Sequence, residues 1–115
     1  MVSSINNTIS ALNAFGKGID VKANNIANVN TDNFKKSRAV NMEGENGDIK
    51  VEISKVDDGL PELTPEEAAA DPRPSNVDLA EEIPGMMIDQ RGFEANTKVI
   101  QTKDEMLGTV LDIVA

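Results

Sequence analysis

The chain of 115 residues has neither histidine nor cysteine, and these absences exclude most of the usual catalytic centres. Without the two side chains there can be no zinc site of the common types, no imidazole or thiolate catalysis and no disulfide. Tryptophan and tyrosine are also absent, and phenylalanine occurs only three times. Few aromatic rings are therefore present to stack on bases or to anchor at a membrane interface.

Positive charge is scarce, because 11 Lys and Arg stand against 20 Asp and Glu for a net charge of -9. The acids concentrate in residues 43–89. A chain of this charge repels phosphate backbones, so nucleic acid is not an expected partner. There is no run of about 18 apolar residues, so direct insertion into a membrane is not expected either. The N-terminal segment also lacks the pattern of a cleaved signal peptide, so any export should use another route.

An amphipathic helix is predicted from Ile5 to about Asn30, because apolar or small residues recur at alternating steps of four and three. This N-terminal seam consists of Ile5, Ile9, Leu12, Gly16, Ile19, Ala23 and Ile26. Such a helix would be about 38 Å long. Gly16 and Gly18 each weaken it by roughly 1 kcal/mol relative to alanine, so packing against another helix must hold it.

The pattern changes to a period of two in the middle of the chain. Ile49, Val51 and Ile53 alternate with polar residues, which predicts a strand with one buried face, and residues 37–42 are its expected antiparallel partner. Asn46-Gly47 should supply the positive φ angles of the hairpin loop. Residues 57–74 then carry four prolines among acids and predict an exposed connection, with a short helix after Thr64.

A second long helix is predicted from Ser75 onward, with Ser75 and Asp78 as its start signal. Its apolar seam repeats at intervals of seven, at Leu79, Met86, Phe93, Ile100, Leu107 and Val114. Pro84 lacks a backbone donor and its ring clashes with the carbonyl four residues earlier. The helix is therefore expected to bend or break between Ala80 and Met86.

The sequence thus predicts a mainly α fold with a small β element. Long N- and C-terminal helices should form an antiparallel coiled coil, with a β-hairpin and an acidic loop between them. One structural unit would comprise an N-terminal helix and turn (1–35), the hairpin and acidic connection (36–74) and a C-terminal helix (75–115). Two helices alone leave the flanks of both seams exposed, so the chain is expected to pack against neighbours.

Four asparagines, at positions 24, 25, 28 and 30, crowd the end of the first helix. Asparagine favours caps and turns, so one interpretation is a frayed helix end. The other is that small amides beside an apolar seam allow close packing and hydrogen bonds to neighbouring chains, and both can hold. Adjacent acids such as Glu66-Glu67 and Glu81-Glu82 suit solvent and a helix N-terminus better than a glycosidase or metal site. We predict no catalytic residue, no metal and no cofactor.

Segments near both ends carry a family resemblance. Residues 9–15 (ISALNAF), 21–31 (VKANNIANVNT) and 34–38 (FKKSR) resemble the N-terminal motif of bacterial flagellar basal-body rod and hook proteins. Residues 75–82 (SNVDLAEE), 90–96 (QRGFEAN) and 98–107 (KVIQTKDEML) resemble the C-terminal motif of the same family. Asn33 stands where members usually have glycine, and asparagine is the next best residue for a left-handed turn.

Within that family, the short length and small insert resemble the proximal rod protein of the C type most. The resemblance implies a non-enzymatic structural subunit of the flagellar basal-body rod, located in the periplasm and exported by the flagellar type III apparatus without a cleaved signal peptide. Its terminal helices would polymerise with other rod subunits and with further copies of itself to form the inner coiled-coil layer of the axial drive shaft.

The seams and the resemblance together predict the residues of the interface between subunits. They are Ile9, Leu12, Ile19, Asn24, Asn25, Ile26, Asn28, Phe93, Asn96, Ile100 and Leu107. The alternative function is a soluble adaptor or export-associated helical module that binds one flagellar partner through the same helix pair. A carboxylate hydrolase stands last, because no convergent acid pair can be placed on facing rigid elements.

Overall fold

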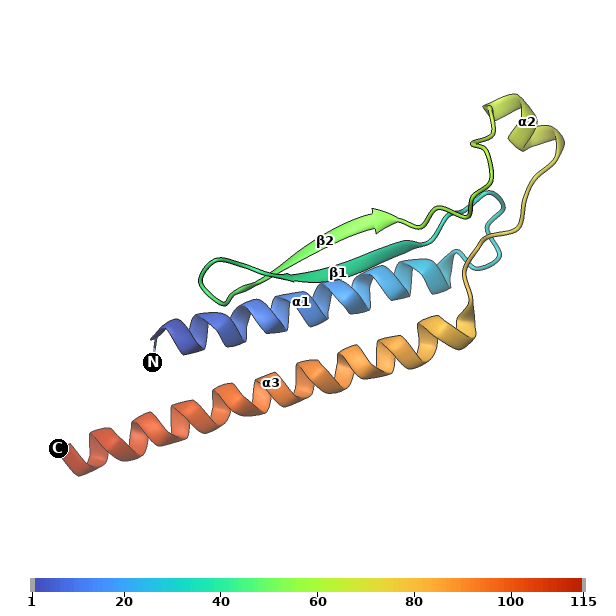
Figure 1. Cartoon of the computed structure of the whole chain (residues 1–115). Helices are drawn as coiled ribbons and strands as arrows, with labels where there is room; N and C mark the ends of the chain where they lie inside the picture. The colour runs from blue at the N-terminus through green and yellow to red at the C-terminus, as the bar shows by residue number, and fades with distance from the viewer. Residues whose placement is uncertain (1, 115) are drawn as a thin grey trace.

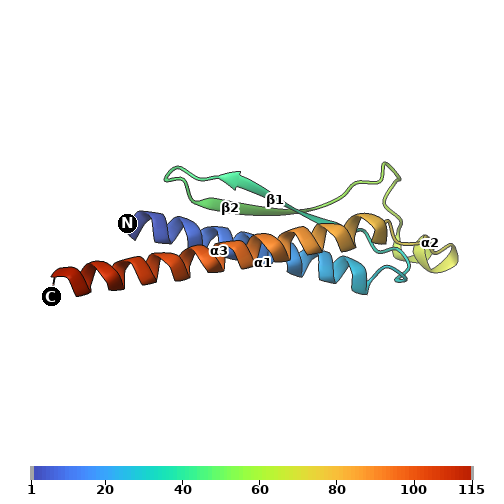
Figure 2. The same cartoon turned by 90° about the horizontal axis from the view of Figure 1, so that it is seen from below.

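The computed structural model describes residues 2–114 as an elongated molecule with extents of 73 × 27 × 17 Å. Its elements are α1 (Val2–Ala27), β1 (Ser37–Glu43), β2 (Ile49–Lys55), α2 (Pro65–Ala70) and α3 (Leu79–Val114). Helices α1 and α3 run antiparallel along most of the molecule, and the two strands pack on α1 (Figure 1). Figure 2 shows the hairpin on one side of the helix pair. The predicted fold class is confirmed.

Helix α1 is the predicted N-terminal helix, and its Asn-rich end leads into a tight turn. The backbone N–H of Asn28 donates to the carbonyls of Asn24 and Asn25 as the helix closes. Asn33 has a φ of 62°, which confirms the left-handed turn expected there. The side-chain oxygen of Asn33 accepts the N–H of Arg73 at 2.9 Å, so the turn is held against the segment that precedes α3.

Strands β1 and β2 form the predicted antiparallel hairpin, with Ser37 opposite Lys55 and Glu43 opposite Ile49. Gly47 has a positive φ of 76°, whereas Asn46 does not adopt one, so this part of the turn prediction was wrong. The N–H of Gly44 donates to the carbonyl of Asp48 at 2.7 Å and closes the loop of residues 44–48, close to the expected loop of residues 43–47. Ile53 is 53% exposed, because a single helix covers only part of the ribbon.

The connection contains the predicted short helix, α2, which begins with a capping box. The hydroxyl of Thr64 accepts the N–H of Glu67, and the Glu67 carboxylate accepts the N–H of Thr64 at 3.0 Å. The bond from the Thr64 backbone lowers the pKa of Glu67 below its usual range. The helix is therefore closed by local contacts and has no buried residue.

Helix α3 begins at Leu79, four residues later than expected from Ser75. Asp78 caps it, because its carboxylate accepts the N–H of Ala80 at 2.9 Å. The hydroxyl of Ser75 instead donates to the carbonyl of Val29 and ties α3 to the turn after α1. No helix within residues 2–114 is long and apolar enough to cross a membrane.

Of the bend or break expected at Pro84, the break was wrong, because α3 is one helix from Leu79 to Val114 with Pro84 inside it. Pro84 lies in the second turn and is exposed, so it removes one helical hydrogen bond, to Ala80, near the helix end. The turns on both sides of it are held against α1 by Glu82 and Asp89. These contacts keep the helix continuous despite the cost of the proline.

Candidate assembly surface

Helices α1 and α3 meet along a line of small and polar residues rather than along the predicted apolar seams. On α1 this contact line includes the buried residues Thr8, Ala11, Gly18 and Asn25. On α3 it includes buried Glu82 and partly buried Gly85, Asp89, Gly92 and Asn96. The apolar seams lie one position later along each helix. The prediction that the seams themselves join the two helices is therefore corrected.

Glycines let the two helices approach each other along this line. The ring of Phe15 lies over Gly92, where an added Cβ would overlap it. Lys22 covers Gly85 in the same way, with its Cε 2.7 Å from an ideal Cβ, and Asp89 covers Gly18, with its Oδ2 at 2.6 Å. In each of the three pairs the two residue numbers add to 107, which is the mark of a single antiparallel alignment of the two helices. Large side chains of one helix thus fit over glycines of the other, in one constant antiparallel register.

Charged side chains join the same two helices at several levels. Lys22 Nζ lies 2.7 Å from Asp89 Oδ2, and Lys103 Nζ lies 3.1 Å from both the Ser4 carbonyl and the Thr8 hydroxyl. Partly exposed pairs of this kind contribute little to stability, typically about 0 to 1 kcal/mol each. These contacts instead favour one alignment of α1 and α3, because each of them forms only in that alignment.

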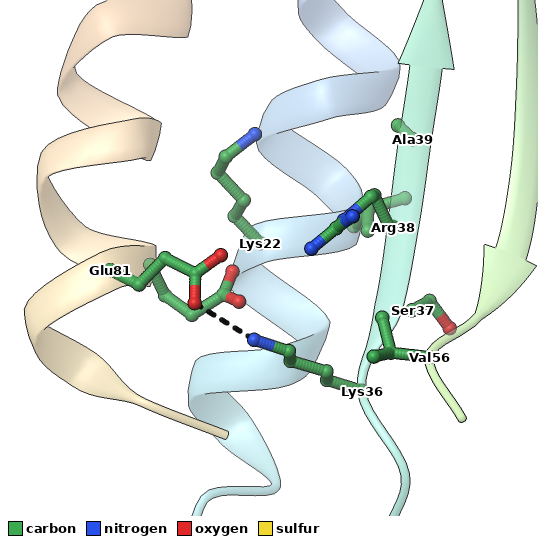
Figure 3. Close-up of a pocket in the computed structure, with 9 residues that line it drawn as sticks. Lys22, Lys36, Ser37, Arg38, Ala39, Val56 and Glu81 are labelled. Carbon is green, nitrogen blue, oxygen red and sulfur yellow. Dashed lines mark hydrogen bonds and ion pairs between the residues drawn. The ribbon is translucent and has the colours of Figure 1, made fainter. Parts of the chain in front are cut away.

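A further ion pair links α3 to the residue that precedes β1. Lys36 Nζ lies 2.9 Å from Glu81 Oε2 (Figure 3). The hydrogen bond from Lys36 is the main cause that lowers the pKa of Glu81, and the positive charges of Lys36, Arg38 and Lys22 add to it. The start of α3 is thereby held against the root of the hairpin.

The two predicted seams lie on one side of the helix pair. In an antiparallel pair, residues one position beyond the contact line project from the same side of both helices. The hairpin occupies the other side of α1, since the hydroxyl of Ser10, one position before Ala11, accepts the N–H of Ile49 at 3.1 Å. We call the seam surface the apolar stripe. It consists of Ile5, Ile9, Leu12, Ile19 and Ile26 of α1 with Leu79, Ile83, Met86, Phe93, Ile100 and Leu107 of α3.

The stripe is only half covered by the chain itself. Ile9 is 45% exposed, Ile83 47% and Phe93 40%, and the other predicted apolar interface residues, Leu12, Ile19, Ile26, Ile100 and Leu107, are partly buried. Contiguous exposed apolar surface of more than a few hundred Å² is uncommon on monomeric proteins and marks interaction sites. The stripe is therefore the candidate functional surface of the molecule.

The predicted asparagines have different environments. Asn24 is exposed, Asn28 donates to the Asn24 carbonyl at 2.8 Å, and Asn96 donates to the Gly92 carbonyl at 2.9 Å. Asn25 is completely buried and bonds to Ser37 and Glu82. Its polar contacts therefore lie within the chain, which differs from the inter-subunit role expected for it.

Sequence reasoning missed two residues of this region. Glu82, expected in solvent, is only 5% exposed, and its Oε2 lies 3.3 Å from the amide nitrogen of Asn25. Asn76 accepts the backbone N–H of Lys36 at 2.6 Å. Both are recognisable only by contacts with residues far away in sequence, and no local pattern indicated them.

A cavity of about 260 Å³ lies where α1, β1 and α3 meet (Figure 3). Its charged lining comprises Lys22, Lys36, Arg38, Glu81 and Glu82. These side chains offer ion pairing and hydrogen bonding. In residues 2–114 no three acidic side chains are grouped so that they could hold a metal ion.

Two protein families match the chain, one at each end. Residues 5–35 match the family described as Flagella basal body rod protein. Residues 74–113 match the family described as Flagellar basal body rod FlgEFG protein C-terminal. The two matches span most of α1 with the following turn and nearly all of α3, so together they include both helices of the apolar stripe.

Individual relatives match over a short segment. The flagellar hook protein FlgE of Treponema pallidum (strain Nichols) is 54% identical over 39 residues, which are 34% of this chain and 8% of the hook protein. The flagellar basal-body rod protein FlgG of Bacillus subtilis (strain 168) is 46% identical over 39 residues, 34% of this chain and 15% of FlgG. The FlgG of Borreliella burgdorferi (strain ATCC 35210 / DSM 4680 / CIP 102532 / B31) is 56% identical over 34 residues, 30% of this chain and 13% of FlgG.

The matched segments are thus a small part of these relatives. The two family matches nevertheless cover more than half of the chain together. The N-terminal match lies on α1 and the C-terminal match on α3, and these two helices pack against each other. From this agreement we conclude that the chain belongs to the family of flagellar rod and hook proteins.

Proposed function

We propose that the chain is a non-enzymatic structural subunit of the flagellar basal-body rod, which polymerises through α1 and α3 into the axial drive shaft. The observation that carries the proposal is the apolar stripe, which runs along both family-matched helices on the side away from the hairpin. Burial of such surface is worth about 25 cal/mol per Å², so covering the stripe with neighbouring subunits is a strong driving force. Asn24, Asn28 and Asn96 would add polar contacts to neighbouring subunits outside the stripe.

The proposed partners are further copies of the chain, other rod subunits and the flagellar type III export apparatus, and the proposed location is the periplasmic rod. Relatives named as rod and hook proteins support an axial position. The small segment between the helices, a hairpin and one short helix, supports a proximal rod subunit of the C type over subunits with larger inserts.

Phe93→Asp tests the stripe as the assembly surface. Phe93 is 40% exposed in the middle of the stripe, so the variant can fold but would bury a charge at the interface. Such burial costs several kcal/mol, and each 1.4 kcal/mol weakens association about tenfold. Sedimentation of the variant, alone and with other rod subunits, should show loss of assemblies, and a complemented strain should lose motility.

Glu66→Ala is the matched control, because Glu66 is exposed on α2, far from the stripe. It should leave assembly and motility unchanged. Equal assembly of both variants would refute the stripe as an interface. A wild-type chain that forms only a complex of fixed stoichiometry with one flagellar partner would support the adaptor function instead.

A further inference from the structure

The side chain of Asn25 takes the place of a neighbouring strand at the root of the hairpin. Its Nδ2 donates to the carbonyl of Ser37 at 2.8 Å, and its Oδ1 accepts the N–H of the same residue at 2.9 Å. A backbone peptide group offers the same donor and acceptor, so the amide satisfies the first residue of β1 as a paired strand would. Because Asn25 is completely buried, water cannot substitute for it.

Asn76 makes a similar bridge immediately beyond the strands. Its Oδ1 accepts the N–H of Lys36 at 2.6 Å, and its Nδ2 donates to the carbonyl of Val56 at 3.4 Å. Lys36 and Val56 are themselves joined, since the N–H of Val56 donates to the Lys36 carbonyl at 2.9 Å. Asn76 therefore holds the open end of the hairpin to the segment that leads into α3.

The same cluster reaches α3. The amide of Asn25 also contacts the carboxylate of buried Glu82, and Lys36 pairs with Glu81. The hairpin root is thus attached to α1 through Asn25 and to the start of α3 through Asn76 and Lys36. We call these contacts of Asn25, Asn76, Lys36, Glu81 and Glu82 the root clamp.

A clamp is needed because few other contacts hold the hairpin in its position on α1. An isolated two-stranded hairpin is marginally stable at best. Val40, Met42 and Ile53 are 44 to 53% exposed, so the ribbon keeps apolar surface that another apolar surface could cover. Within the described residues, its loop end is bonded to a side chain of α1 only through the N–H of Ile49 and the hydroxyl of Ser10. The apolar stripe on the far side of α1 offers a competing surface.

We propose that Asn25 and Asn76 are positioning residues, which set the direction in which the hairpin leaves the helix pair and so keep it off the apolar stripe. The first half of this statement concerns the folded chain alone. The second half rests on the proposed function, because only there does the stripe need to stay open for other copies.

Asn76→Ala tests the direction of the hairpin without touching the contact between α1 and α3. Hydrogen exchange at residues 36–56 should accelerate about tenfold or more, while the middles of α1 and α3 keep their protection. Because the chain has no cysteine, spin labels can be placed at Asn46→Cys in the hairpin loop and Gln101→Cys on exposed α3. The distribution of distances between the two spin labels should be narrow in the parent chain and broad in the Asn76→Ala variant.

Asn30→Ala is the control, because Asn30 is an exposed asparagine of the turn after α1 and is not among the proposed interface residues. It should leave both the exchange rates and the label distance unchanged. An Asn76→Ala chain that keeps the exchange and the label distance of the parent would overturn the proposal.

Asn25→Asp separates hydrogen bonding from packing, because aspartate has nearly the same shape. It removes the donor to Ser37 and puts a carboxylate beside that of Glu82, so the hairpin root should lose protection at neutral pH. Glu82→Gln in the same chain supplies an amide that can donate to the introduced carboxylate, and most of the protection should return. No loss of protection, or a loss that Glu82→Gln does not restore, as expected from the buried charge alone, would refute the clamp.

Self-association of each variant is measured in parallel. If a hairpin released from the root clamp covers the apolar stripe, the affinity of self-association should fall at least about tenfold. Broadened label distances with unchanged assembly would refute the second half of the proposal and leave the first intact. If the parent does not assemble at all, the proposed function fails, whereas the label distances still decide the clamp.

Discussion

At the scale of single residues, the smallest side chains decide how α1 and α3 meet. Gly92, Gly85 and Gly18 each lie beneath a larger side chain of the opposite helix. Gly16 has nothing within 4 Å of an added Cβ. The two kinds of glycine are indistinguishable in sequence, but they should respond oppositely to substitution.

Gly92→Ala should lower the free energy of unfolding by about 1 to 3 kcal/mol, because its Cβ would overlap the ring of Phe15. Gly16→Ala should raise it by about 1 kcal/mol, since alanine is the better helix former and space is free there. Urea denaturation measures both changes. Phe15→Leu should relieve the Gly92→Ala variant, and a stabilising effect of Gly92→Ala alone would contradict the close approach of the helices.

The carboxylate of Glu81 gives a pH-dependent test of its contact with Lys36. Its pKa is lowered in the folded chain, so its ionised form favours folding. That contribution is fully present above the ordinary glutamate pKa, roughly 4.3, and is lost as the pH falls through the lower pKa of the folded state.

Lys36→Gln should raise the pKa of Glu81 toward its ordinary value, as measured by an NMR titration of the side-chain carboxyl carbon. Glu67 serves as the internal control, because its pKa is lowered chiefly by the backbone of Thr64 rather than by a lysine. An unchanged titration of Glu81 would show that the Lys36 contact is absent in solution.

At the scale of elements, local signals and tertiary contacts disagree at Pro84. The proline favours a break, yet α3 continues through it, because the surrounding turns are anchored by Glu82 and Asp89. The helix therefore carries a local cost that packing offsets.

Pro84→Ala should raise the free energy of unfolding by up to about 3 kcal/mol, since alanine can donate the missing bond to the carbonyl of Ala80. Pro84 is exposed, so little packing is lost. Pro65→Ala is the control, because Pro65 stands at the start of α2, where proline is favoured, and no gain is expected. Chemical denaturation of both variants provides the measurement, and a destabilised Pro84→Ala would show that the proline has a structural role.

At the scale of the whole molecule, the helix pair has almost no apolar core of its own. The buried hydrophobic side chains of the described part, residues 2–114, are those of Ala11 and Ala14. Ordering each residue costs roughly 1 to 2 kcal/mol of backbone entropy, which so thin a core can hardly offset. The stability of the chain should therefore depend on its neighbours.

We expect thermal stability and amide protection of α1 and α3 to rise with protein concentration, because association stabilises the folded state by mass action. Hydrogen exchange at two concentrations, with the association state checked by sedimentation, measures this. Strong protection along both helices in a verified monomer would contradict the expected dependence on partners.

Much of the local structure could be predicted from sequence. Both terminal helices, the hairpin and α2 with its cap follow from periodicity and short-range hydrogen bonds, whereas the left-handed Asn33 was expected from the family resemblance. Such signals act between residues a few positions apart, so they are visible without the fold. The family motifs at the two ends likewise indicated the helices that carry the candidate surface.

The tertiary structure alone decided which face of each helix meets the other. Two lines one residue apart, the apolar stripe and the contact line, share the same seven-residue repeat, so periodicity cannot choose between them. The choice depends on close approach at Gly92 and Gly18 and on bonds such as Asn25 to Glu82, which join residues far apart in sequence. Those contacts exist only once the chain has folded back on itself, and they leave the large apolar side chains facing outward.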